Sequence, residues 1–247
     1  NRDWRIGVMN MQTEGVGDLD LDAQNYTVAA LQRRIGVRSF LAGIFVNRQG
    51  FNGNTMDFGD FNRVAGLDFN LASANNIWRG KAFYHHSFSP NVDENSFTHA
   101  VWLMYNTRNI QIHYNHEIVG ENYNAEVGFV PRVSNYNPET GTFEHRTYMR
   151  FEDSFEYKFY PESKLINTHG PRVYWSEYTD ADLKTTERHA QITYGAKFKD
   201  QSELALKVNN RRVLLYWDTD VTFNGNTPIP AGDYEFAHAR LEFESSR

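Results

Sequence analysis

An alternation of apolar and polar side chains recurs along most of this chain. Between residues 143 and 160, one side is apolar and largely aromatic, with Asp153 as the misfit, and the opposite side is a row of charged and polar residues. A period of two places successive side chains on opposite faces of a β-strand. The pattern therefore predicts strands whose two faces meet different surroundings.

The same alternation returns in segments of about ten residues separated by turn-forming residues. The clearest are 4–13, 26–35, 37–48, 63–72, 77–88, 109–119, 189–198 and 202–209. Residues 19–31 favour a loop followed by a strand rather than a helix. We expect roughly a dozen strands, with short turns at one rim and longer loops at the other. The predicted fold is all-β: a transmembrane antiparallel β-barrel of the outer-membrane type, apolar outside and wet inside.

Composition bounds the class of protein. At 247 residues, the whole of 1–247 is expected to be one barrel domain. A net charge of −6 argues against a broad nucleic-acid surface, and the absence of Cys excludes disulfides and thiolate metal sites. Mean hydropathy is −0.65, and there is no apolar run long enough for a spanning helix. A barrel is compatible with both, because only alternate residues of its strands touch lipid.

One alternative stays open: a secreted, soluble β-sandwich that binds or hydrolyses polysaccharide. It predicts short strands and a concave face carrying Trp175 or Trp217. Strands in sandwiches usually run to about 5–6 residues. The alternating segments here are longer, which favours the barrel.

The polar rows supply the candidate site residues. If the barrel is correct, these side chains line its lumen: Arg79, Lys81, His85, His113, Glu117, Arg146, Arg150, Glu152, Glu156, Lys158, His189 and Lys197. Glu152 and Glu156 stand four residues apart on one strand, too far for the carboxylate pair of a retaining glycosidase. The acids and bases are better explained as interleaved lumenal charge. We therefore expect a non-enzymatic protein with no catalytic residues, no metal site and no cofactor.

Two further groups are candidates for binding. Tyr174, Trp175 and Tyr178 form an aromatic cluster that suits either a sugar-stacking platform or an interfacial girdle. Residues 122–137 form a candidate functional loop, folded at or into the mouth of the barrel, with Tyr123, Arg132 and Tyr136 as its notable side chains.

Five stretches also resemble one family. They are Trp4–Thr13, Asn124–Arg132, Tyr160–Leu165, Ile229–Phe236 and Phe243–Arg247. The chain resembles the uncharacterised Gram-negative outer-membrane β-barrel domain that lies C-terminal to a carbohydrate-binding family 9-like module. The match is spread from end to end, and it supplies no catalytic residues.

The resemblance implies a cell outer membrane location in a Gram-negative bacterium, with the lipid bilayer as a partner. Glycans and other outer-membrane or surface lipoprotein subunits are further expected partners, and nucleic acid is not. It also implies that the barrel continues with further strands beyond the Ser-Ser-Arg stretch and that a sugar-binding-like domain precedes it. We therefore expect a barrel domain that is incomplete at both ends. The expected function is a porin-like solute channel, or a cell-surface membrane platform for glycan handling or a secretion-associated assembly.

Overall fold

The computed structural model describes residues 3–19, 21–128, 130–222, 224–225 and 227–245. Its secondary structure is 69 % strand, with antiparallel pairing. The prediction of an all-β antiparallel protein is confirmed. In the described part of the chain, no helix has the length and apolar character needed to cross a membrane.

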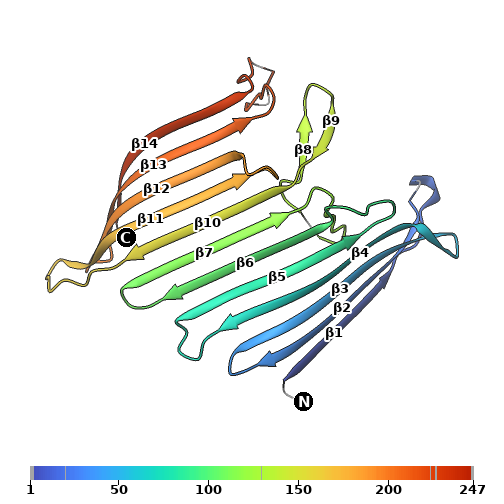
Figure 1. The fold of residues 1–247 in the computed structure, drawn as a ribbon, viewed down its shortest axis with the longest axis horizontal. Coiled ribbons are helices and arrows are strands. Elements are labelled where there is room, and N and C mark those ends of the chain that lie inside the picture. Colours follow the sequence, from blue (N-terminus) through green and yellow to red (C-terminus); the bar gives the residue numbers. More distant parts are fainter. Residues whose placement is uncertain (1–2, 20, 129, 223, 226, 246–247) are drawn as a thin grey trace. The chain divides into compact units, whose positions relative to one another are not determined.

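Twelve strands form the main sheet (Figure 1). They are β1 (Trp4–Gln12), β2 (Ala23–Ile35), β3 (Ser39–Asn52), β4 (Thr55–Ala72), β5 (Trp78–Phe88), β6 (Phe97–Asn106), β7 (Ile110–Val119), β10 (Tyr148–Tyr157), β11 (Ile166–Thr179), β12 (Thr185–Phe198), β13 (Glu203–Leu215) and β14 (Gly232–Glu244). A second sheet is the hairpin of β8 (Ser134–Asn137) and β9 (Thr142–His145), and a 3-10 helix, η1, spans Gly17–Leu19. The expected dozen strands are thus present.

Each strand of the main sheet pairs with the next one along the chain, apart from the step from β7 to β10 that passes over the small hairpin. The order begins at β1 and ends at β14, and in the described residues the sheet is not closed into a barrel. The prediction of an antiparallel sheet is therefore confirmed, whereas closure of that sheet into a barrel is not observed.

The chain divides into two compact units. Unit 1 comprises Asn1–Val101, Glu117–Asn135 and His145–Tyr148, and unit 2 comprises Trp102–His116, Tyr136–Glu144 and Met149–Arg247. Strands β1–β5 lie in unit 1, and β10–β14 lie in unit 2 apart from Tyr148 at the start of β10. Each unit is described below by itself.

The strand register of unit 1 gathers apolar side chains on one face. Two adjacent cross-strand rows are Ile6, Leu31, Gly43, Leu67, Tyr84 and Val8, Ala29, Phe45, Ala65, His86. We call this side the apolar face of unit 1. It is well exposed: Ile6 and Leu67 retain 75 % and 63 % of their accessible surface.

The opposite side of β2–β5, the polar face of unit 1, is more buried than the apolar face. It carries Arg48 and Asn62, which stand directly opposite each other on β3 and β4. Val64, on the same side, is only 6 % exposed. The usual arrangement of a soluble sheet, with large apolar residues covered and polar ones in water, is therefore reversed.

Unit 2 repeats this reversal. One face has the rows Val173, Ile192, Val208, Ala239 and Tyr194, Leu206, Leu241, and the other has Tyr174, Gln191, Asn209, His238 and Arg172, Thr193, Lys207, Arg240. Leu241 is 70 % exposed, whereas Asn209 on the polar side is 3 % exposed. We call these the apolar and polar faces of unit 2.

The alternating run 143–160 is not one strand, contrary to expectation. Its first part, Thr142–His145, is β9, and Tyr148–Tyr157 is β10, with Arg146 and Thr147 between them outside any strand. The break arises because β9 pairs locally with β8 across a turn in which Gly141 has a φ of +70°. A left-handed residue of this kind is favoured by glycine and closes a short hairpin.

Candidate functional site

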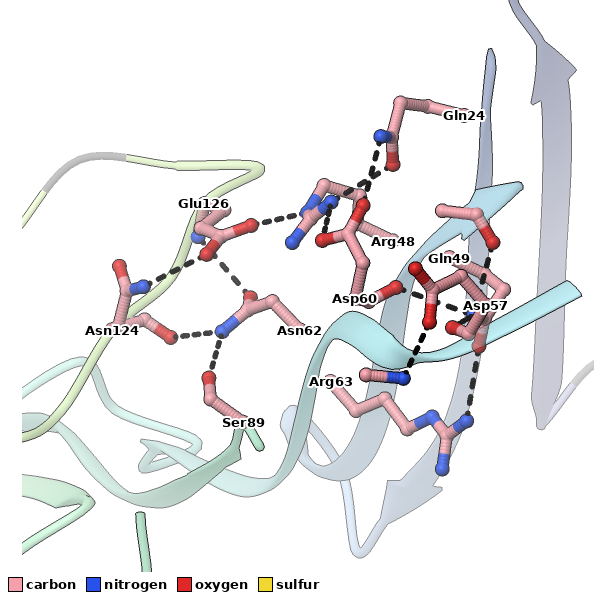
Figure 2. Close-up of polar contacts among 12 residues, drawn as sticks. Gln24, Arg48, Gln49, Asp57, Asp60, Asn62, Arg63, Ser89, Asn124 and Glu126 are labelled. Carbon is pink, nitrogen blue, oxygen red and sulfur yellow. Dashed lines mark hydrogen bonds and ion pairs between the residues drawn. The ribbon is translucent and has the colours of Figure 1, made fainter. Parts of the chain in front are cut away.

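The candidate site is a loop pinned to the polar face of unit 1. Residues 120–128 and 130–133 follow β7 and fold back over β3, β4 and β5, where Figure 2 shows Asn124 and Glu126 meeting Asn62 and Arg48. We call residues 120–133 the pinned loop. The functional loop predicted at 122–137 overlaps the pinned loop at 122–133, and residues 134–137 form β8 instead. The functional role of the loop stays a prediction.

Asn62 holds the middle of the pinned loop. It is 2 % exposed, and its side-chain amide donates to the carbonyl of Asn124 at 3.0 Å and to Ser89 Oγ at 3.0 Å. Its Oδ1 accepts the backbone N–H of Glu126 at 3.2 Å. Every polar atom of this buried amide is thus engaged. Burying an amide costs free energy unless its hydrogen bonds are made, so the loop and Asn62 stabilise each other.

A second attachment comes from β5. Ser87, also 2 % exposed, accepts the backbone N–H of Asn124 at 3.1 Å through its Oγ. The start of the loop is tied down by Gly120 N–H, which donates to Phe97 O at 2.9 Å. A Cβ added at Gly120 would lie 2.1 Å from Asn95 O, so only glycine allows this close approach.

The far end of the pinned loop is held by the residues just before β10. Val133 is 5 % exposed, and its carbonyl accepts the backbone N–H of Arg146 at 3.0 Å. Glu121 N–H donates to Thr147 Oγ1 at 3.1 Å. Along its described length, the loop is therefore held by hydrogen bonds to its own backbone groups, in addition to any packing of its side chains.

Arg48 is the charged centre of the site. Its guanidinium forms ion pairs with Asp60, at 2.7 Å, and with Glu126, and it donates to Gln24 Oε1 at 2.8 Å. Gln24 in turn donates to Asp60 Oδ2 at 3.1 Å. One guanidinium thus links a carboxylate of β4 to a carboxylate of the pinned loop. Asp60, Glu126 and Arg48 together carry two negative charges and one positive charge, so the net charge of the three side chains is −1.

A bulge in β4 places Asp60 over the polar face. Residues 57–60 of β4 stand opposite the single residue Gly50 of β3. A Cβ at Gly50 would lie 2.0 Å from Asp60 Oδ2, so any larger residue at position 50 would displace this carboxylate from the β3 backbone. The bulge itself is held by Gln49, whose Nε2 donates to Asp57 O at 2.5 Å and to Asp60 O at 3.2 Å (Figure 2). Bulges of this kind re-aim a side chain beside functional sites.

The environment shifts the pKa values of Asp60 and Tyr123. Burial alone would raise the pKa of Asp60. Hydrogen bonds from Gln24 and Arg48, together with the charge of Arg48, outweigh this effect, so the pKa of Asp60 is lowered. Burial raises the pKa of the Tyr123 phenol above its usual value. Asp60 is therefore held as the anion, and Tyr123 as the neutral phenol, at neutral pH.

A cavity of about 480 Å³ lies between the pinned loop and the strands of unit 1. Its lining includes the carboxylates Asp60, Glu121 and Glu126, with Arg48 and His145 as the basic side chains. Phe61, Pro90, Val92 and Val130 supply apolar wall. The lining of the cavity is therefore mildly acidic and partly apolar, which suits small polar or cationic solutes.

The candidate lumen residues of unit 1 lie mainly on β5. Lys81 Nζ and His85 Nε2 both approach Asp68 Oδ1 on the polar face, at 3.6 Å and 3.2 Å. Arg79 stands opposite Ala72 at the start of β5 and is exposed. Glu117 lies in β7 and Arg146 in the break before β10, beside the pinned loop.

In unit 2 most candidate residues lie on the polar face and pair across it. Arg150 forms an ion pair with Glu152, which also accepts from Tyr174 Oη at 3.1 Å. The other contacts are Glu156 with Lys158 at 3.4 Å, Lys197 with Glu203 at 2.9 Å, His189 Nε2 with Asn209 Oδ1 at 2.9 Å, and the ring of His113 with Trp102 at 5.9 Å. Acids and bases thus alternate on this surface; that the surface lines a lumen stays a prediction.

A larger cavity, of about 840 Å³, lies on the polar face of unit 2. Its charged lining consists of Lys158, Arg172, Lys197 and Lys207, against Glu156, Glu203, Glu242 and Glu244. Lys207 Nζ and Glu242 Oε2 are 2.5 Å apart. The charges balance, so this surface offers many hydrogen-bonding groups and no net charge.

The aromatic cluster Tyr174, Trp175 and Tyr178 is divided between two faces. Trp175 stands opposite Asp153 and Ala190 on the apolar face of unit 2, with Arg188 5.5 Å from its ring centroid. Tyr174 and Tyr178 point to the polar face, where Tyr178 lies under Arg150 at 5.6 Å. Because adjacent strand residues alternate, the three rings do not form one stacking platform.

The three candidate side chains of the loop also have different settings. Tyr123 is 9 % exposed, inside the pinned loop, and Arg132 is exposed in a turn with a φ of +64°. Tyr136 lies in β8 and packs on Phe143 of β9, with ring centroids 5.4 Å apart. Of the resembling stretches, Phe129, Ser246 and Arg247 lie outside the described residues.

Sequence reasoning did not single out the residues that build the site: Gln24, Arg48, Asp60, Asn62 and Glu126. Glu126 lies in one of the resembling stretches, and Arg48 ends an alternating segment. Asn62 has no local signal, because its partners are distant in the chain. Among the described residues, no group of three or more His, Asp or Glu side chains is arranged to hold a metal ion.

Comparisons with family models, with curated proteins and with solved structures found no match to this chain. The family resemblance of the five stretches therefore stays a prediction.

Proposed function

We propose that this chain is a non-enzymatic wall of a β-barrel in the outer membrane of a Gram-negative bacterium, and that hydrophilic solutes pass along its polar face. The observation that carries the proposal is the reversed exposure of both units. Large apolar side chains such as Leu67 and Leu241 are exposed on one face, while polar side chains are covered on the other. An apolar surface that continues across several strands marks contact with a partner or a membrane.

The dimensions of the apolar face support a membrane. On β12 it extends from Ala190 to Phe198, nine residues, close to the ~9–11 that a tilted strand needs to cross hydrocarbon. Beyond Ala190 the same face carries an ion pair, Arg188 with Glu235 at 2.7 Å. A band of apolar residues that ends in charge fits hydrocarbon bordered by an aqueous interface.

The proposal requires partners for both sheet edges. β1 and β14 end the strand order, and unpaired backbone groups are costly in lipid, several kcal/mol for each group. In the membrane these edges are hydrogen-bonded, either to each other or to further strands. The open sheet is in that case a wall whose closure completes the barrel.

The pinned loop acts in this proposal as a constriction. It brings Glu126 and Glu121 over a polar face that already carries Asp60 and Arg48, so carboxylates outnumber guanidinium groups at its cavity. Cations are then favoured over anions of the same size. A plugged barrel that serves as a platform for glycan handling or secretion is the second form of the same membrane protein, without conduction.

Cysteine labelling tests the membrane assignment, since the chain has no native Cys. Ala29 and Ala30 are adjacent in β2 and lie on opposite faces. In vesicles, Ala29→Cys should resist a water-soluble maleimide and Ala30→Cys should react. In a chaotrope both should react, which is the matched control.

Equal labelling of the two cysteines in vesicles, or a protein that stays soluble without detergent, would reject the membrane barrel in favour of the soluble sandwich. Conductance in planar bilayers separates the two membrane forms: an open barrel passes ions, and a plugged platform does not. Gel mobility that changes on boiling is the expected sign of a closed barrel.

A further inference from the structure

The apolar face of unit 1 holds a groove of about 680 Å³ that crosses β1–β5. Its walls include Ile6, Leu31, Phe45 and Leu67, and small residues, Ala29, Gly43 and Ala65, form its floor. On this face a small residue precedes a large one along each of three strands: Ala29 and Leu31 on β2, Gly43 and Phe45 on β3, Ala65 and Leu67 on β4. The recess is therefore built by the sequence of each strand. A recess of this size on an already apolar surface suits a hydrocarbon chain.

A row of polar residues borders this groove toward the pinned-loop end of the strands. It reads Asn10, Thr27, Asn47, Arg63 across β1–β4, and the next row is Gln12, Asn25, Gln49. Every polar side chain in these two rows is neutral except Arg63. The groove therefore ends at a single fixed positive charge.

Arg63 is positioned by neutral groups. Its Nε donates to Asn47 Oδ1 at 3.0 Å and its Nη2 to Gln49 Oε1 at 3.2 Å, and its guanidinium lies over Phe61 at 4.3 Å from the ring centroid. No carboxylate pairs with it among the residues that the structure describes. The charge is oriented but not neutralised, which leaves the guanidinium's remaining N–H groups for an external anion.

His86 lines the groove on the other side of β4 from these contacts. It stands opposite Ala65 on β5, while Arg63 stands opposite Phe88, so the two side chains are diagonal neighbours on paired strands. Such neighbours lie about 7–8 Å apart along the sheet, but the guanidinium of Arg63 is held toward Asn47 and Gln49 of β3. Tyr84 Oη is 3.4 Å from His86 Nδ1, which turns the other ring nitrogen of His86 away from Tyr84.

We infer that the apolar face of unit 1 binds one anionic phospholipid, with an acyl chain in the groove and the headgroup phosphate on Arg63. The inference rests on the proposed membrane location and adds a specific lipid site to it. Charge complementarity selects the occupant: an apolar recess next to one unneutralised guanidinium fits an amphiphile with a single negative head. A neutral apolar protein segment would leave Arg63 uncompensated.

Native mass spectrometry of the delipidated full chain tests this site, with phosphatidylglycerol and phosphatidylcholine of identical chains as probes. Wild type should retain phosphatidylglycerol about fivefold better. Arg63→Gln should abolish that preference while leaving phosphatidylcholine retention unchanged. Gly43→Leu should lower retention of both lipids, since a Cβ at Gly43 meets only ordinary contacts at 3.8 and 3.9 Å and the longer side chain fills the recess.

The matched control is Arg212→Gln in unit 2, an arginine already paired with Asp233, which should keep the lipid preference. Preference retained by Arg63→Gln, retention unchanged in Gly43→Leu, or displacement of phosphatidylglycerol by inorganic phosphate alone would each overturn the lipid site. Failure of the wild type to enter vesicles would instead refute the proposed membrane function. The two failures are thus distinguishable.

Discussion

Asn62 and Asn124 lie 62 positions apart, and the side-chain amide of Asn62 donates to the backbone carbonyl of Asn124 at 3.0 Å. The Oδ1 of the same amide accepts the backbone N–H of Glu126. One buried side chain thus supplies the hydrogen bonds that these loop backbone groups would otherwise make with water. This contact turns a long connection between β7 and β8 into part of the polar face of unit 1. It is the contact whose loss should most directly free the pinned loop.

Asn62→Ala should release the pinned loop. The change leaves backbone groups of Asn124 and Glu126 without partners, at a cost of about 1–3 kcal/mol in unfolding free energy. Hydrogen exchange of residues 122–128, followed by mass spectrometry, should show faster exchange in the variant. Asn70→Ala, on the same face of β4 but away from the loop, is the control and should exchange as wild type. Unchanged exchange in Asn62→Ala would show that other contacts hold the loop.

The charge of the Arg48 group should set ion preference if the barrel conducts. Glu126→Gln removes one of two carboxylates and should lower the cation-to-anion permeability ratio, whereas Arg48→Gln should raise it. Reversal potentials under a salt gradient in planar bilayers measure both. Glu14→Gln, exposed in the connection before β2, should leave the ratio unchanged. Shifts of the same sign in the two site variants would contradict the assignment.

Acid should free the loop only at low pH. Asp60 lies in the bulge of β4, outside the apolar band, and its pKa is lowered by Gln24 and Arg48 against the effect of burial. A lowered carboxyl pKa contributes stability that is present above the unfolded-state pKa, near 3.9, and is lost as pH falls through the lower folded-state value. A nitroxide at Val127→Cys should therefore gain mobility only below about pH 4.

Asp60→Asn provides the comparison for this titration. An amide at residue 60 carries no charge at any pH, so the variant should lose the part of the acid-induced mobility change that Asp60 contributes. An identical pH profile in the presence and absence of the Asp60 carboxyl group would assign the transition to another group.

Arginine on the apolar face of unit 2 should be destabilising in a membrane. Ile192, 61 % exposed, lies between Val173 and Val208 in the middle of that face. Ile192→Arg should lower the free energy of unfolding in lipid vesicles by about 2–4 kcal/mol. Gln191→Arg, one residue away on the polar face, should change it by about 0.5 kcal/mol or less. Urea titrations followed by tryptophan fluorescence measure both, and equal losses would contradict the facing of β12.

Much of the strand content followed from local alternation. Segments 4–13, 77–88 and 109–119 match β1, β5 and β7 within one residue at each end. The alternating run 143–160 was misassigned, because a period of two does not reveal where a strand stops pairing with one neighbour and the chain turns to another. β6, β11 and β14 were not among the clear segments; in β11, Gly170 and Pro171 interrupt the pattern.

The sequence pointed to part of the candidate site's loop only. The functional loop predicted at 122–137 overlaps the pinned loop at 122–133, where Tyr123 is buried, and 134–137 is strand β8. Arg48, Asp60 and Asn62 were not identified as site residues, because nothing near them in the chain marks a contact with a loop more than 60 residues away. The bulge at 57–60 was equally hidden, since it depends on Gly50 of the neighbouring strand.

The amino-acid sequence alone determined which side chains share a face, because the Cβ atoms of a β-strand alternate whatever the strand pairs with. Tertiary structure decided the rest: that the apolar rows are the more exposed ones, that β9 leaves the long run for β8, and that Asn62 meets Asn124. These depend on pairing and register between distant segments, which arise from the summed free energy of many contacts rather than from any local pattern.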